Sequence, residues 1–249
     1  MHSTVSEDNI LSVDIGGSNI KDTILTSLGI LPDIYKRLPT PVPSTPQNVI
    51  DLLRDVVKDF PACQKVSVGF PGYVRNGRIQ TAPNLGTVQW QNFNLQQHLC
   101  QALGKPVRLV NDADLQGLGV VQGKGFEMVI TLGTGFGTSL LLDGNLLPHL
   151  ELAHHPVHKN KTYDQYVGEQ ALEKHGEEKW NKRMQLVLQI LKTVFNYDHL
   201  FISGGNASKL RFPLDENITI VTNREGIKGG FRLWQQDENR FADTLYSAL

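Results

Sequence analysis

Three short stretches place glycines and small polar residues directly after an apolar run. They are Gly16-Gly17-Ser18-Asn19, Gly133-Thr134-Gly135 and Gly204-Gly205-Asn206. Such turns expose backbone N–H groups that bind anions, and the ends of strands are where α/β sheets hold their ligands. Each turn alone could serve only the geometry of the chain. Together they predict a site that holds one phosphate-bearing ligand.

The first of these turns is not a Walker phosphate loop. Its glycines do not fit the spacing G-x-x-x-x-G-K-[ST], and the residues that follow, Ile20–Thr26, have the pattern of a strand rather than a helix. We therefore expect a hairpin turn in which glycine either has a positive φ or lets two backbones approach closely. Lys21 follows the turn, and it either faces the phosphates or is an ordinary exposed lysine of the strand.

A carboxylate, Asp112, lies where the apolar run Val107–Val110 ends and a helix begins. The helix N-terminus favours the ionised form of such a group by about 0.3–1 kcal/mol. An ionised carboxylate held there can accept a proton from a hydroxyl during phosphoryl transfer. The competing interpretation is a helix cap, because Asn111, Asp112 and Asp114 all favour helix starts. The residues alone favour the cap, and for Asp114 we expect a cap or a surface position.

The elements that must position these residues alternate between strands and helices. Apolar runs predict strands at 10–15, 20–26, 64–70, 107–110, 127–132 and 199–203, with a further strand at 29–38. Helices are predicted at 46–60, 94–103 and 165–196, after Gly205, and in the tail from 226 to 249. This alternation is typical of an α/β fold.

Composition limits the classes of protein. With 249 residues, 40% of them hydrophobic, the chain can form one large domain or two lobes with separate cores. The formal net charge of -1 argues against general attraction to nucleic acid or to membranes, and no apolar stretch approaches the roughly 18 residues of a membrane span. Cys63 and Cys100 lack metal-ligand spacing. We therefore expect no zinc site, no disulfide framework and a cytoplasmic location.

Five motifs occur in the order found in sugar kinases of the ROK family (repressors, open reading frames, kinases): VDIGGSNIK, VNDAD, TLGTGFG, ELAH and FISGGNASKL. The resemblance covers about residues 10–235. Within the family the chain is most similar to the polyphosphate glucokinase branch, in its length, in the segment KTYDQYVGEQALEKHGEEKWNKR and in lacking the cysteine-rich zinc motif. The resemblance implies the two-lobed, α/β actin-like ATPase (ribonuclease H-like) fold. Residues 1–110 with a returning helix in 226–249 would form the small lobe, and 111–225 the large lobe.

The resemblance also implies a reaction and roles for the residues on the phosphate side. A terminal phosphoryl group would pass from polyphosphate, and also from ATP, to the 6-hydroxyl of glucose in a cleft between the lobes. Asp112 would be the general base, and Asp14 would position Mg2+ through water. The turn from Gly16 to Asn19 would hold the transferred phosphoryl group, and the turn at Gly204 would lie against the nucleoside in relatives that use ATP. The alternative for Asp14 is a buried carboxylate that caps the turn.

A sugar pocket needs side chains that donate and accept hydrogen bonds in fixed directions. The candidates are Asn84, Asn111, Asp112, Glu151 and His154. The segment ELAH resembles the family's ELGH, whose Glu and His hold sugar hydroxyls. Here Ala153 replaces the glycine, which excludes any conformation that requires a positive φ. Asn84 either touches the sugar or only holds its own loop.

A further carboxylate completes the sugar contacts in many members of the family. Asp164 and Glu169 both lie near the corresponding place, and the sequence does not choose between them. His155 and His158 follow His154, but no set of paired carboxylates or cysteines accompanies this run. We therefore interpret it as a sugar contact with surface histidines, in preference to a metal site.

A polyphosphate donor requires an extended track of positive charge. Lys179, Lys182 and Arg183 share one face at helical spacing and predict such a track. The alternative is a solvated amphipathic helix that nearby glutamates partly neutralise. Other readings of the whole chain are a strictly ATP-dependent hexokinase, a non-catalytic sugar sensor, which would carry an N-terminal DNA-binding domain, and an actin-like filament protein. The resemblance implies a homodimer.

Overall fold

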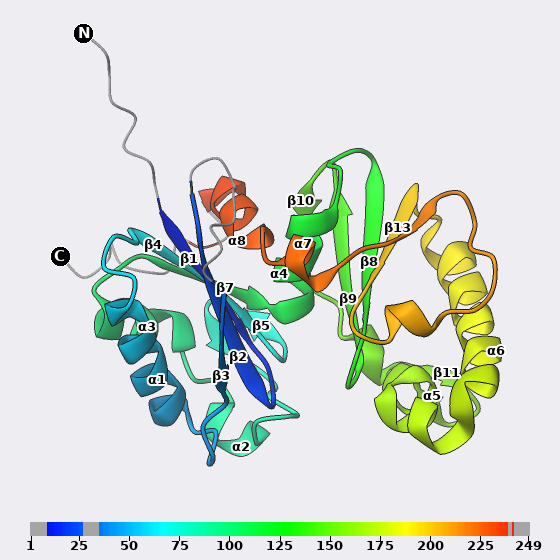
Figure 1. Cartoon of the computed structure of the whole chain (residues 1–249), viewed down its shortest axis with the longest axis horizontal. Helices are drawn as coiled ribbons and strands as arrows, with labels where there is room; N and C mark the ends of the chain where they lie inside the picture. Colours follow the sequence, from blue (N-terminus) through cyan, green and yellow to red (C-terminus); the bar gives the residue numbers. More distant parts are fainter. Residues whose placement is uncertain (1–8, 27–34, 239–240, 242–249) are drawn as a thin grey trace, which may run out of the picture. The chain divides into compact units, whose positions relative to one another are not determined.

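The computed structural model describes residues 9–26, 35–238 and 241, and the chain divides into two compact units (Figure 1). Unit 1 consists of Met1–Gly119 and Ile227–Leu249, and unit 2 of Val120–Gly226. Each unit contains its own sheet and its own hydrophobic core.

The first segment of unit 1 extends beyond the division that we expected at residue 110. Residues 112–119 form all but the last residue of helix α4 (Asp112–Val120), which follows directly on the last strand of the unit 1 sheet. The guanidinium of Arg232, from the C-terminal segment, donates a 3.0 Å hydrogen bond to the carbonyl of Leu118 in this helix. Because α4 is joined to the returning C-terminal segment in this way, it belongs to unit 1.

Unit 1 is built on a five-stranded sheet with the order β3-β2-β1-β4-β7. Its strands are β1 (Ile10–Ile15), β2 (Asn19–Leu25), β3 (Tyr35–Pro39), β4 (Lys65–Phe70) and β7 (Val107–Asn111). β1, β2 and β3 pair antiparallel, whereas β4 is parallel to β1 and β7 is parallel to β4. The carboxyl ends of β1, β4 and β7 therefore meet at one edge of the sheet. Asp14 and Asn111 lie at this edge, where open α/β sheets bind ligands.

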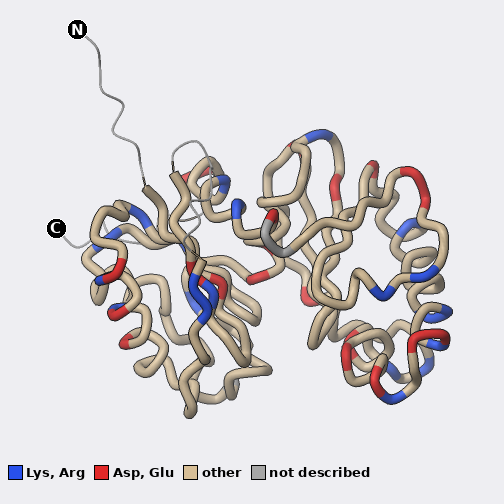
Figure 2. The backbone as a smooth tube through the Cα atoms, in the orientation of Figure 1, with Lys and Arg blue, Asp and Glu red and all other residues tan. Residues whose placement is uncertain are grey.

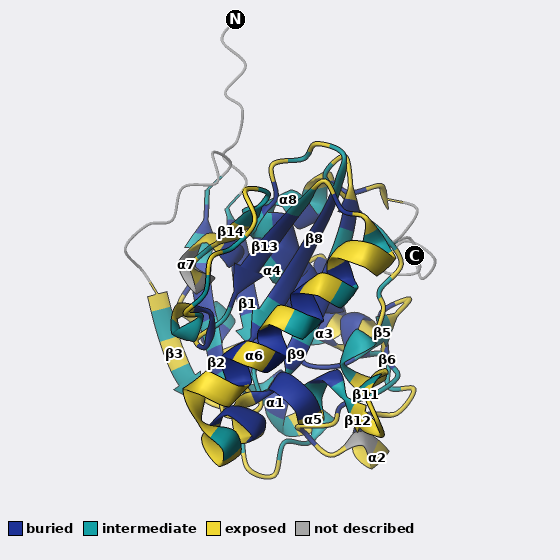
Figure 3. Ribbon diagram, turned by 90° about the vertical axis from the view of Figure 1, so that its right-hand side faces the viewer, coloured by how far each residue is buried: buried dark blue, intermediate teal, exposed yellow. Residues whose placement is uncertain are grey.

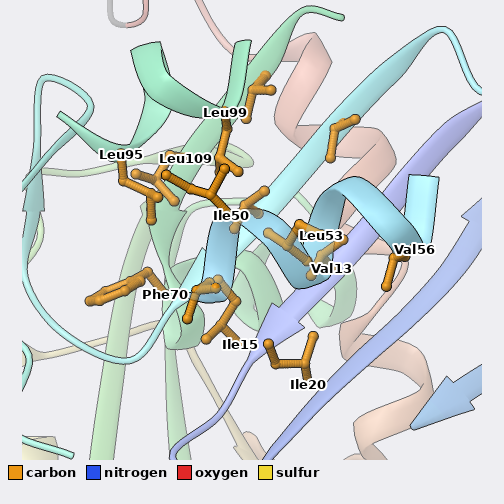
Figure 4. Packing of buried hydrophobic residues seen from close by; sticks show 14 of the residues in the cluster. Val13, Ile15, Ile20, Ile50, Leu53, Val56, Phe70, Leu95, Leu99 and Leu109 are labelled. Carbon is orange, nitrogen blue, oxygen red and sulfur yellow. The ribbon is translucent and has the colours of Figure 1, made fainter. Parts of the chain in front are cut away.

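Two helices supply the core on one face of this sheet. They are α1 (Pro46–Lys58), capped by the side chain of Thr45, and α3 (Leu95–Leu103), capped by Asn94. Buried apolar side chains from β1 and α1 pack together (Figure 4), among them Val13, Ile15, Ile50, Leu53 and Val56. Burying each such side chain contributes roughly 1.5–3 kcal/mol. This packing fixes β1, and with it the turn that follows β1.

The opposite face of the same sheet carries polar side chains that bind the C-terminal segment. Ser12 Oγ donates to the carbonyl of Ile227 (3.2 Å), and Ser67 Oγ donates to the carbonyl of Gly230 (2.6 Å). Arg108 donates to the carbonyl of Leu233 (2.7 Å). The bound segment contains α8 (Gly229–Arg232) and the 3-10 helix η3 (Leu233–Gln235). Between β4 and α3 the chain adds the short elements β5 (Val74–Arg75), β6 (Arg78–Ile79) and α2 (Thr87–Trp90).

Unit 2 is also built on a five-stranded sheet, with the order β10-β9-β8-β13-β14. Its strands are β8 (Phe126–Leu132), β9 (Phe136–Leu142), β10 (Asn145–Leu146), β13 (His199–Ser203) and β14 (Ile218–Ile220). β8, β9 and β10 pair antiparallel, and β13 is parallel to both β8 and β14. The turns after β8 and β13 therefore lie at the same edge, because these two strands run in the same direction.

The long helix α6 (Glu169–Phe195) covers the unit 2 core. It is kinked at Gly176, whose φ is 75°. A buried stripe alternates with an exposed one along the helix (Figure 3), and the buried stripe includes Trp180, Met184 and Leu191. The remaining elements are η1 (Leu152–His154), β11 (Pro156–His158), β12 (Lys161–Thr162), α5 (Tyr163–Val167), η2 (Ala207–Lys209) and α7 (Asn223–Gly226).

Several predicted helices are shorter than the sequence indicates. The segment 165–196 is divided at Gly168 into α5 and α6. After Gly205 there is only the single 3-10 turn η2, because the backbone N–H of Arg211 donates to Asn181 on α6 (2.7 Å) and turns the chain away. In the tail, the described helix is confined to α8 and η3.

Some predictions fall on residues that the structure does not describe. These are the first part of the predicted strand at 29–38, up to residue 34, and most of the tail beyond 238. Among the residues that the structure does describe, no helix has the length and apolar character that crossing a membrane requires.

Candidate active site

The Gly16–Asn19 turn joins β1 to β2 and is closed by backbone hydrogen bonds. The N–H of Gly16 donates to the carbonyl of Asn19 (2.9 Å), and Thr40 Oγ1 donates to the carbonyl of Gly16 (2.6 Å). A Cβ at Gly16 would lie 2.7 Å from the Asn19 carbonyl oxygen. Neither glycine of the turn has a positive φ. Close backbone approach, and not unusual dihedral angles, is thus the reason for glycine at position 16.

Asp14 and Lys21 form a cross-strand pair beside this turn. They are direct partners in the β1–β2 register, and Lys21 Nζ lies 3.3 Å from Asp14 Oδ2. Burial raises the pKa of Asp14, and the ammonium of Lys21 opposes that rise. Lys21 is therefore bound to a carboxylate at the end of the sheet rather than being an ordinary exposed lysine. An ion pair of this kind can accommodate added negative charge on the lysine side and a cation on the carboxylate side.

The junction of β7 and α4 presents Asn111 and Asp112. Asn111 is buried, and its Oδ1 accepts a hydrogen bond from the N–H of Ala113 (2.8 Å) while its Nδ2 donates to the carbonyl of Gly72 (3.1 Å). Asp112 Oδ1 accepts from the same N–H (2.9 Å), and its side chain is half-buried. The side chains of Asn111 and Asp112 thus both cap the start of α4, and this hydrogen bond holds the Asp112 carboxylate at the helix start. Asp114 is buried, so the expected surface position is wrong for it.

Asn84 lies next to the first turn. A Cβ at Gly17 would be 3.1 Å from the Cβ of Asn84, and both residues are exposed. Four predicted site residues of unit 1 therefore lie near one another, at the edge of the sheet or in the loops beside it: Asp14, Gly17, Lys21 and Asn84.

The Gly133–Gly135 turn joins β8 to β9 in unit 2, and it is held by residues from further along the chain. Asp164 Oδ1 accepts a 2.6 Å hydrogen bond from the N–H of Phe136, the first residue after the turn. The N–H of Glu169, at the start of α6, donates to the carbonyls of Gly133 (3.1 Å) and Thr134 (3.3 Å). The start of α6 and the carboxylate of Asp164 therefore fix the conformation of this turn.

The third Gly-rich turn lies against the second. The N–H of Asn206 donates to the carbonyl of Leu132 (3.0 Å), and Asn206 Nδ2 donates to the carbonyl of Gly133 (3.3 Å). Gly204 has a φ of 95°, and a Cβ there would collide with the Leu132 backbone, so glycine is required at this position. Two turns that are distant in the sequence thus form one cluster of backbone groups in unit 2.

Glu151 is flanked by two histidines at different depths. Its Oε2 lies 3.7 Å from Nε2 of His154, whose side chain is 54% exposed. Its Oε1 lies 3.5 Å from Nε2 of His149, whose side chain is only 7% exposed. Ala153, between Glu151 and His154, lies in the 3-10 helix η1 and has no positive φ. The replacement of glycine by alanine is therefore compatible with this backbone.

His149 is a residue that the sequence analysis missed. It precedes Glu151 by two positions in the segment PHLELAH. Only the motif beginning at Glu151 resembles the family, so the sequence offered no reason to separate His149 from the other histidines. The spacing i, i+2 around a carboxylate was the one available signal.

The two carboxylates left open by the sequence occupy different environments. Burial raises the pKa of Asp164; the Phe136 N–H and the nearby imidazole of His154 oppose this rise, and the charge of Glu151 adds to it. Asp164 is therefore electrostatically coupled to both residues of the ELAH motif. Glu169 is exposed in the first turn of α6. Asp164, and not Glu169, is gathered with Glu151 and His154.

The three cations predicted to form a basic face of α6 are not all exposed and unpaired. Arg183 is 8% exposed, donates to the carbonyl of Tyr166 (2.9 Å) and lies over the Tyr166 ring. Lys182 pairs with Glu178 (2.8 Å), so of the three only Lys179 is exposed and has no ion pair with another residue that the structure describes. Figure 2 shows acidic and basic residues interspersed on this helix.

A different basic cluster is formed around His175. Burial lowers the pKa of His175, and the nearby cations Arg183, Lys179, Lys161 and Lys174 lower it further. Lys161 comes from β12 and the other exposed members come from α6. The positive charge that the sequence placed at 179–183 is therefore centred closer to the start of α6.

The described residues offer three chemical capacities. Backbone groups of three glycine-rich turns can bind phosphate oxygens, and a carboxylate at a helix start can accept a proton. A cluster of carboxylate and imidazole groups can bind hydroxyls. Among the described residues, no three His, Cys, Asp or Glu side chains gather as a metal cage.

The chain is similar to known proteins over most of its length. The model of the ROK family matches residues 10–182. A polyphosphate glucokinase of Mycobacterium tuberculosis (strain CDC 1551 / Oshkosh) is 33% identical over 236 residues, which are 87% of this chain and 88% of the relative. A polyphosphate glucokinase of Mycobacterium leprae (strain TN) is 32% identical over 91% of this chain and 74% of its own length.

Solved structures show the same fold. An inorganic polyphosphate/ATP-glucomannokinase from Arthrobacter sp. strain KM matches with a TM-score of 0.82 and 28% identity, covering 92% of this chain and 99% of that protein. A ROK family glucokinase from Streptomyces griseus, in complex with glucose and AMPPNP, matches with a TM-score of 0.73 over 90% of this chain and 98% of its own. At 18% identity that second likeness concerns the fold alone. The predicted α/β actin-like ATPase fold is confirmed.

Proposed function

This chain belongs to the ROK family, and on that premise we propose that it transfers the terminal phosphoryl group of inorganic polyphosphate, and also of ATP, to the 6-hydroxyl of glucose. The observation that carries the proposal is the 33% identity to a polyphosphate glucokinase over 87% of the chain. The Arthrobacter kinase of the same fold is named for both donors, which supports the use of ATP as well.

Asp112 is the general base of the proposed reaction. Its carboxylate accepts the proton of the 6-hydroxyl while that oxygen forms a bond to the terminal phosphorus of the donor. The bond from phosphorus to the bridging oxygen breaks, and the shortened polyphosphate or ADP leaves with the electron pair. The Ala113 N–H holds one oxygen of Asp112 at 2.9 Å, so the carboxylate has a fixed direction. General base catalysis of this kind contributes about 10²- to 10⁴-fold.

Glycine-rich turns of both units bind phosphate in this proposal. In unit 1 the exposed backbone of Gly17 and Ser18 receives the transferred phosphoryl group, with Lys21 supplying positive charge. In unit 2 the paired turns at Gly133–Gly135 and Gly204–Asn206 receive the rest of the donor. The close backbone approach at Gly16 and the required glycine at 204 keep these turns tight. Each turn can then direct backbone N–H groups at phosphate oxygens.

Mg2+ is the proposed cofactor, and Asp14 is the residue that would position it. The lone, partly buried carboxylate fits a Mg2+ that keeps most of its waters and binds substrate phosphates, because such an ion does not need a protein cage. Lys21 Nζ lies 3.3 Å from Asp14 Oδ2, so the carboxylate would be shared between the lysine and the ion, and the ammonium would turn toward the phosphates. When bound, Mg2+ would neutralise charge on the phosphoryl group.

The glucose contacts are assigned to two groups of residues. Glu151 and His154 bind hydroxyls from unit 2, and Asp164 joins them because it is coupled to both. Asn84 and Asn111 contribute from unit 1, where Asn111 still has an amide hydrogen beyond the bond to Gly72. We place Glu169 at the start of α6 as a support for the Gly133 turn rather than as a sugar ligand.

The proposed polyphosphate track is the basic cluster near the start of α6. Lys179 remains a member, and Lys161 and Lys174 join it. Lys182 is neutralised by Glu178, and Arg183 has a structural role through Tyr166. The support for this track is that Lys179, Lys161 and Lys174 all lie close enough to His175 to lower its pKa, so their positive charge is gathered in one place, where a polyanion would bind.

The test is the formation of glucose 6-phosphate by purified protein with Mg2+, with polyphosphate or ATP as donor at matched phosphoryl concentration. We expect product with both donors and faster turnover with polyphosphate. Product with ATP alone would favour the strictly ATP-dependent kinase. Product with neither, despite glucose binding in calorimetry, would favour a sugar sensor.

Two properties that the resemblance implies stay predictions. They are a homodimer and a cytoplasmic location. Light scattering of the purified protein measures its mass in solution and would distinguish a dimer from a 27.8 kDa monomer.

A further inference from the structure

Hydrogen bonds fix the backbone of the loop from residue 149 to residue 154. Thr138 Oγ1 on β9 donates to the carbonyl of Leu150 (3.0 Å), and the N–H of His154 donates to the carbonyl of Glu151 (3.2 Å). The side chain of Glu151 makes no capping hydrogen bond to η1, although Glu151 occupies the cap position. The carboxylate of Glu151 is therefore available for contacts other than those that form the helix.

The two oxygens of Glu151 differ in their surroundings. Oε1 is buried and accepts no hydrogen bond from the described residues. Oε2 is directed to His154, which is exposed. A buried carboxylate oxygen is costly unless positive charge or a donor lies near it. The group that lies near Oε1 is the imidazole of His149, with Nε2 at 3.5 Å.

His149 can keep the Glu151 carboxylate in place because its own side chain is buried and therefore has few alternative positions. Its side chain is 7% exposed, whereas that of His154 is 54% exposed. A buried ring samples few rotamers, and electrostatic attraction to a nearby carboxylate is stronger away from water. The inner histidine can therefore keep one oxygen in place while the outer oxygen stays accessible beside His154.

We infer that His149 is a positioning residue, which orients the Glu151 carboxylate so that Oε2 faces a glucose hydroxyl. The inference rests on the proposed function, in which Glu151 binds the sugar. His149 itself does not touch glucose in this account. Its removal should therefore weaken glucose binding through Glu151 and leave the donor site unchanged.

The test compares His149→Leu, His149→Gln, Glu151→Gln and the double variant His149→Leu/Glu151→Gln. Glucose affinity is measured by calorimetry, and KM for glucose and for the donor are measured kinetically. We expect His149→Leu to raise the glucose Kd and KM by about tenfold, because the buried Oε1 of Glu151 loses the imidazole that lies 3.5 Å from it. The donor KM should stay within about twofold, and His149→Gln, which keeps an N–H donor, should recover most of the affinity.

The double-mutant cycle separates positioning from packing. If His149 acts through Glu151, the double variant should bind glucose no more weakly than Glu151→Gln alone. His158→Gln is the matched control, because His158 lies in the same region, is exposed and stacks on Tyr166 with ring centroids 5.4 Å apart. That variant should bind glucose as the wild type does.

Three results would overturn the inference. They are unchanged glucose affinity in His149→Leu, equal losses in the Leu and Gln variants, and additive losses in the double variant. Should His149→Leu fail to fold, His149→Met, which also lacks an N–H donor, replaces it in both the wild-type and the Glu151→Gln backgrounds. Wild-type protein that binds no glucose would instead overturn the proposed function.

Discussion

The carboxylate of Asp164 accepts a 2.6 Å hydrogen bond from the backbone N–H of Phe136, 28 residues earlier in the chain. Through this bond a residue of α5 fixes the end of the Gly133–Gly135 turn. The same carboxylate is coupled to Glu151 and His154. One side chain thus connects the proposed phosphate turn of unit 2 with its proposed sugar residues.

Replacing Asp164 by Ala should loosen the turn. We expect kcat/KM for the donor to fall about 10- to 100-fold, because small displacements of positioning groups cost that much. Asp164→Asn keeps an acceptor oxygen for the Phe136 N–H and should retain most of the activity. Initial-rate kinetics with both substrates varied gives the answer. A rise in the glucose KM alone would instead identify Asp164 as a sugar ligand only.

Replacing Asp112 by Asn should remove the general base while keeping the shape of the side chain. We expect kcat to fall by about 10²- to 10⁴-fold, with glucose affinity within a few fold of the wild type. Coupled detection of glucose 6-phosphate and calorimetry measure the two quantities. Asp114→Asn, at a buried position two residues later, is the control for helix stability. Substantial residual turnover in Asp112→Asn would exclude Asp112 as the base.

Reversing the charge of Lys179 should affect polyphosphate more than ATP. With Lys179→Glu we expect the polyphosphate KM to rise about three- to tenfold, which corresponds to roughly 1 kcal/mol at an exposed site. The effect should shrink at high salt. Lys192→Glu, at the other end of α6, is the control, since it loses only an exposed pair with Asp215. Equal effects on both donors would reject the proposed track.

Arg183→Ala should reduce stability rather than donor preference. The guanidinium is buried, donates to the Tyr166 carbonyl and packs on the Tyr166 ring. Leaving that carbonyl without its donor costs about 1–3 kcal/mol. We expect a lower midpoint in urea unfolding and an unchanged ratio of polyphosphate to ATP activity in the protein that remains folded. A changed ratio with unchanged stability would return Arg183 to the polyphosphate track.

Asp22 should make the protein less stable as pH rises. It is fully buried on β2 opposite Val13, and neither carboxylate oxygen has a hydrogen-bond partner among the described residues. Burial raises the pKa of Asp22 above the usual value for an aspartate; the charge of Lys36 opposes this rise and that of Asp59 adds to it. The folded state therefore binds this proton more tightly than the unfolded state does. The resulting stability is present at low pH and is lost as pH rises through the folded pKa.

Asp22→Asn should remove this dependence. We expect its melting temperature to exceed that of the wild type at pH 8, by about 2–4 °C for each kcal/mol gained, with a smaller difference at pH 5. Asp55→Asn is the control, because Asp55 is an exposed residue of α1 paired with Lys58. A gain that is the same at both pH values would show that ionisation of Asp22 is not the cause.

Much of the fold and many of the site residues could be predicted from local sequence. β1 and β2 pair where the alternation of apolar residues placed them, and α1 and α3 begin at the caps Thr45 and Asn94. Periodicity and capping act over a few residues, so they are readable in the sequence. The assignments of Asp112, Glu151 and His154 to a kinase came from motif resemblance, and their roles remain proposals.

What the sequence by itself determined was the class of the chain: an α/β kinase of the ROK family with glycine-rich turns at three strand ends. Only the tertiary structure decided which side chains were already engaged. Arg183 is buried against Tyr166, Asn206 donates to Gly133 from 73 residues away, and His149 lies beneath Glu151. These outcomes depend on burial and on contacts between distant segments. The burial of a single polar side chain and contacts between distant segments leave no periodic signal in the sequence, because they are set by how complete elements pack.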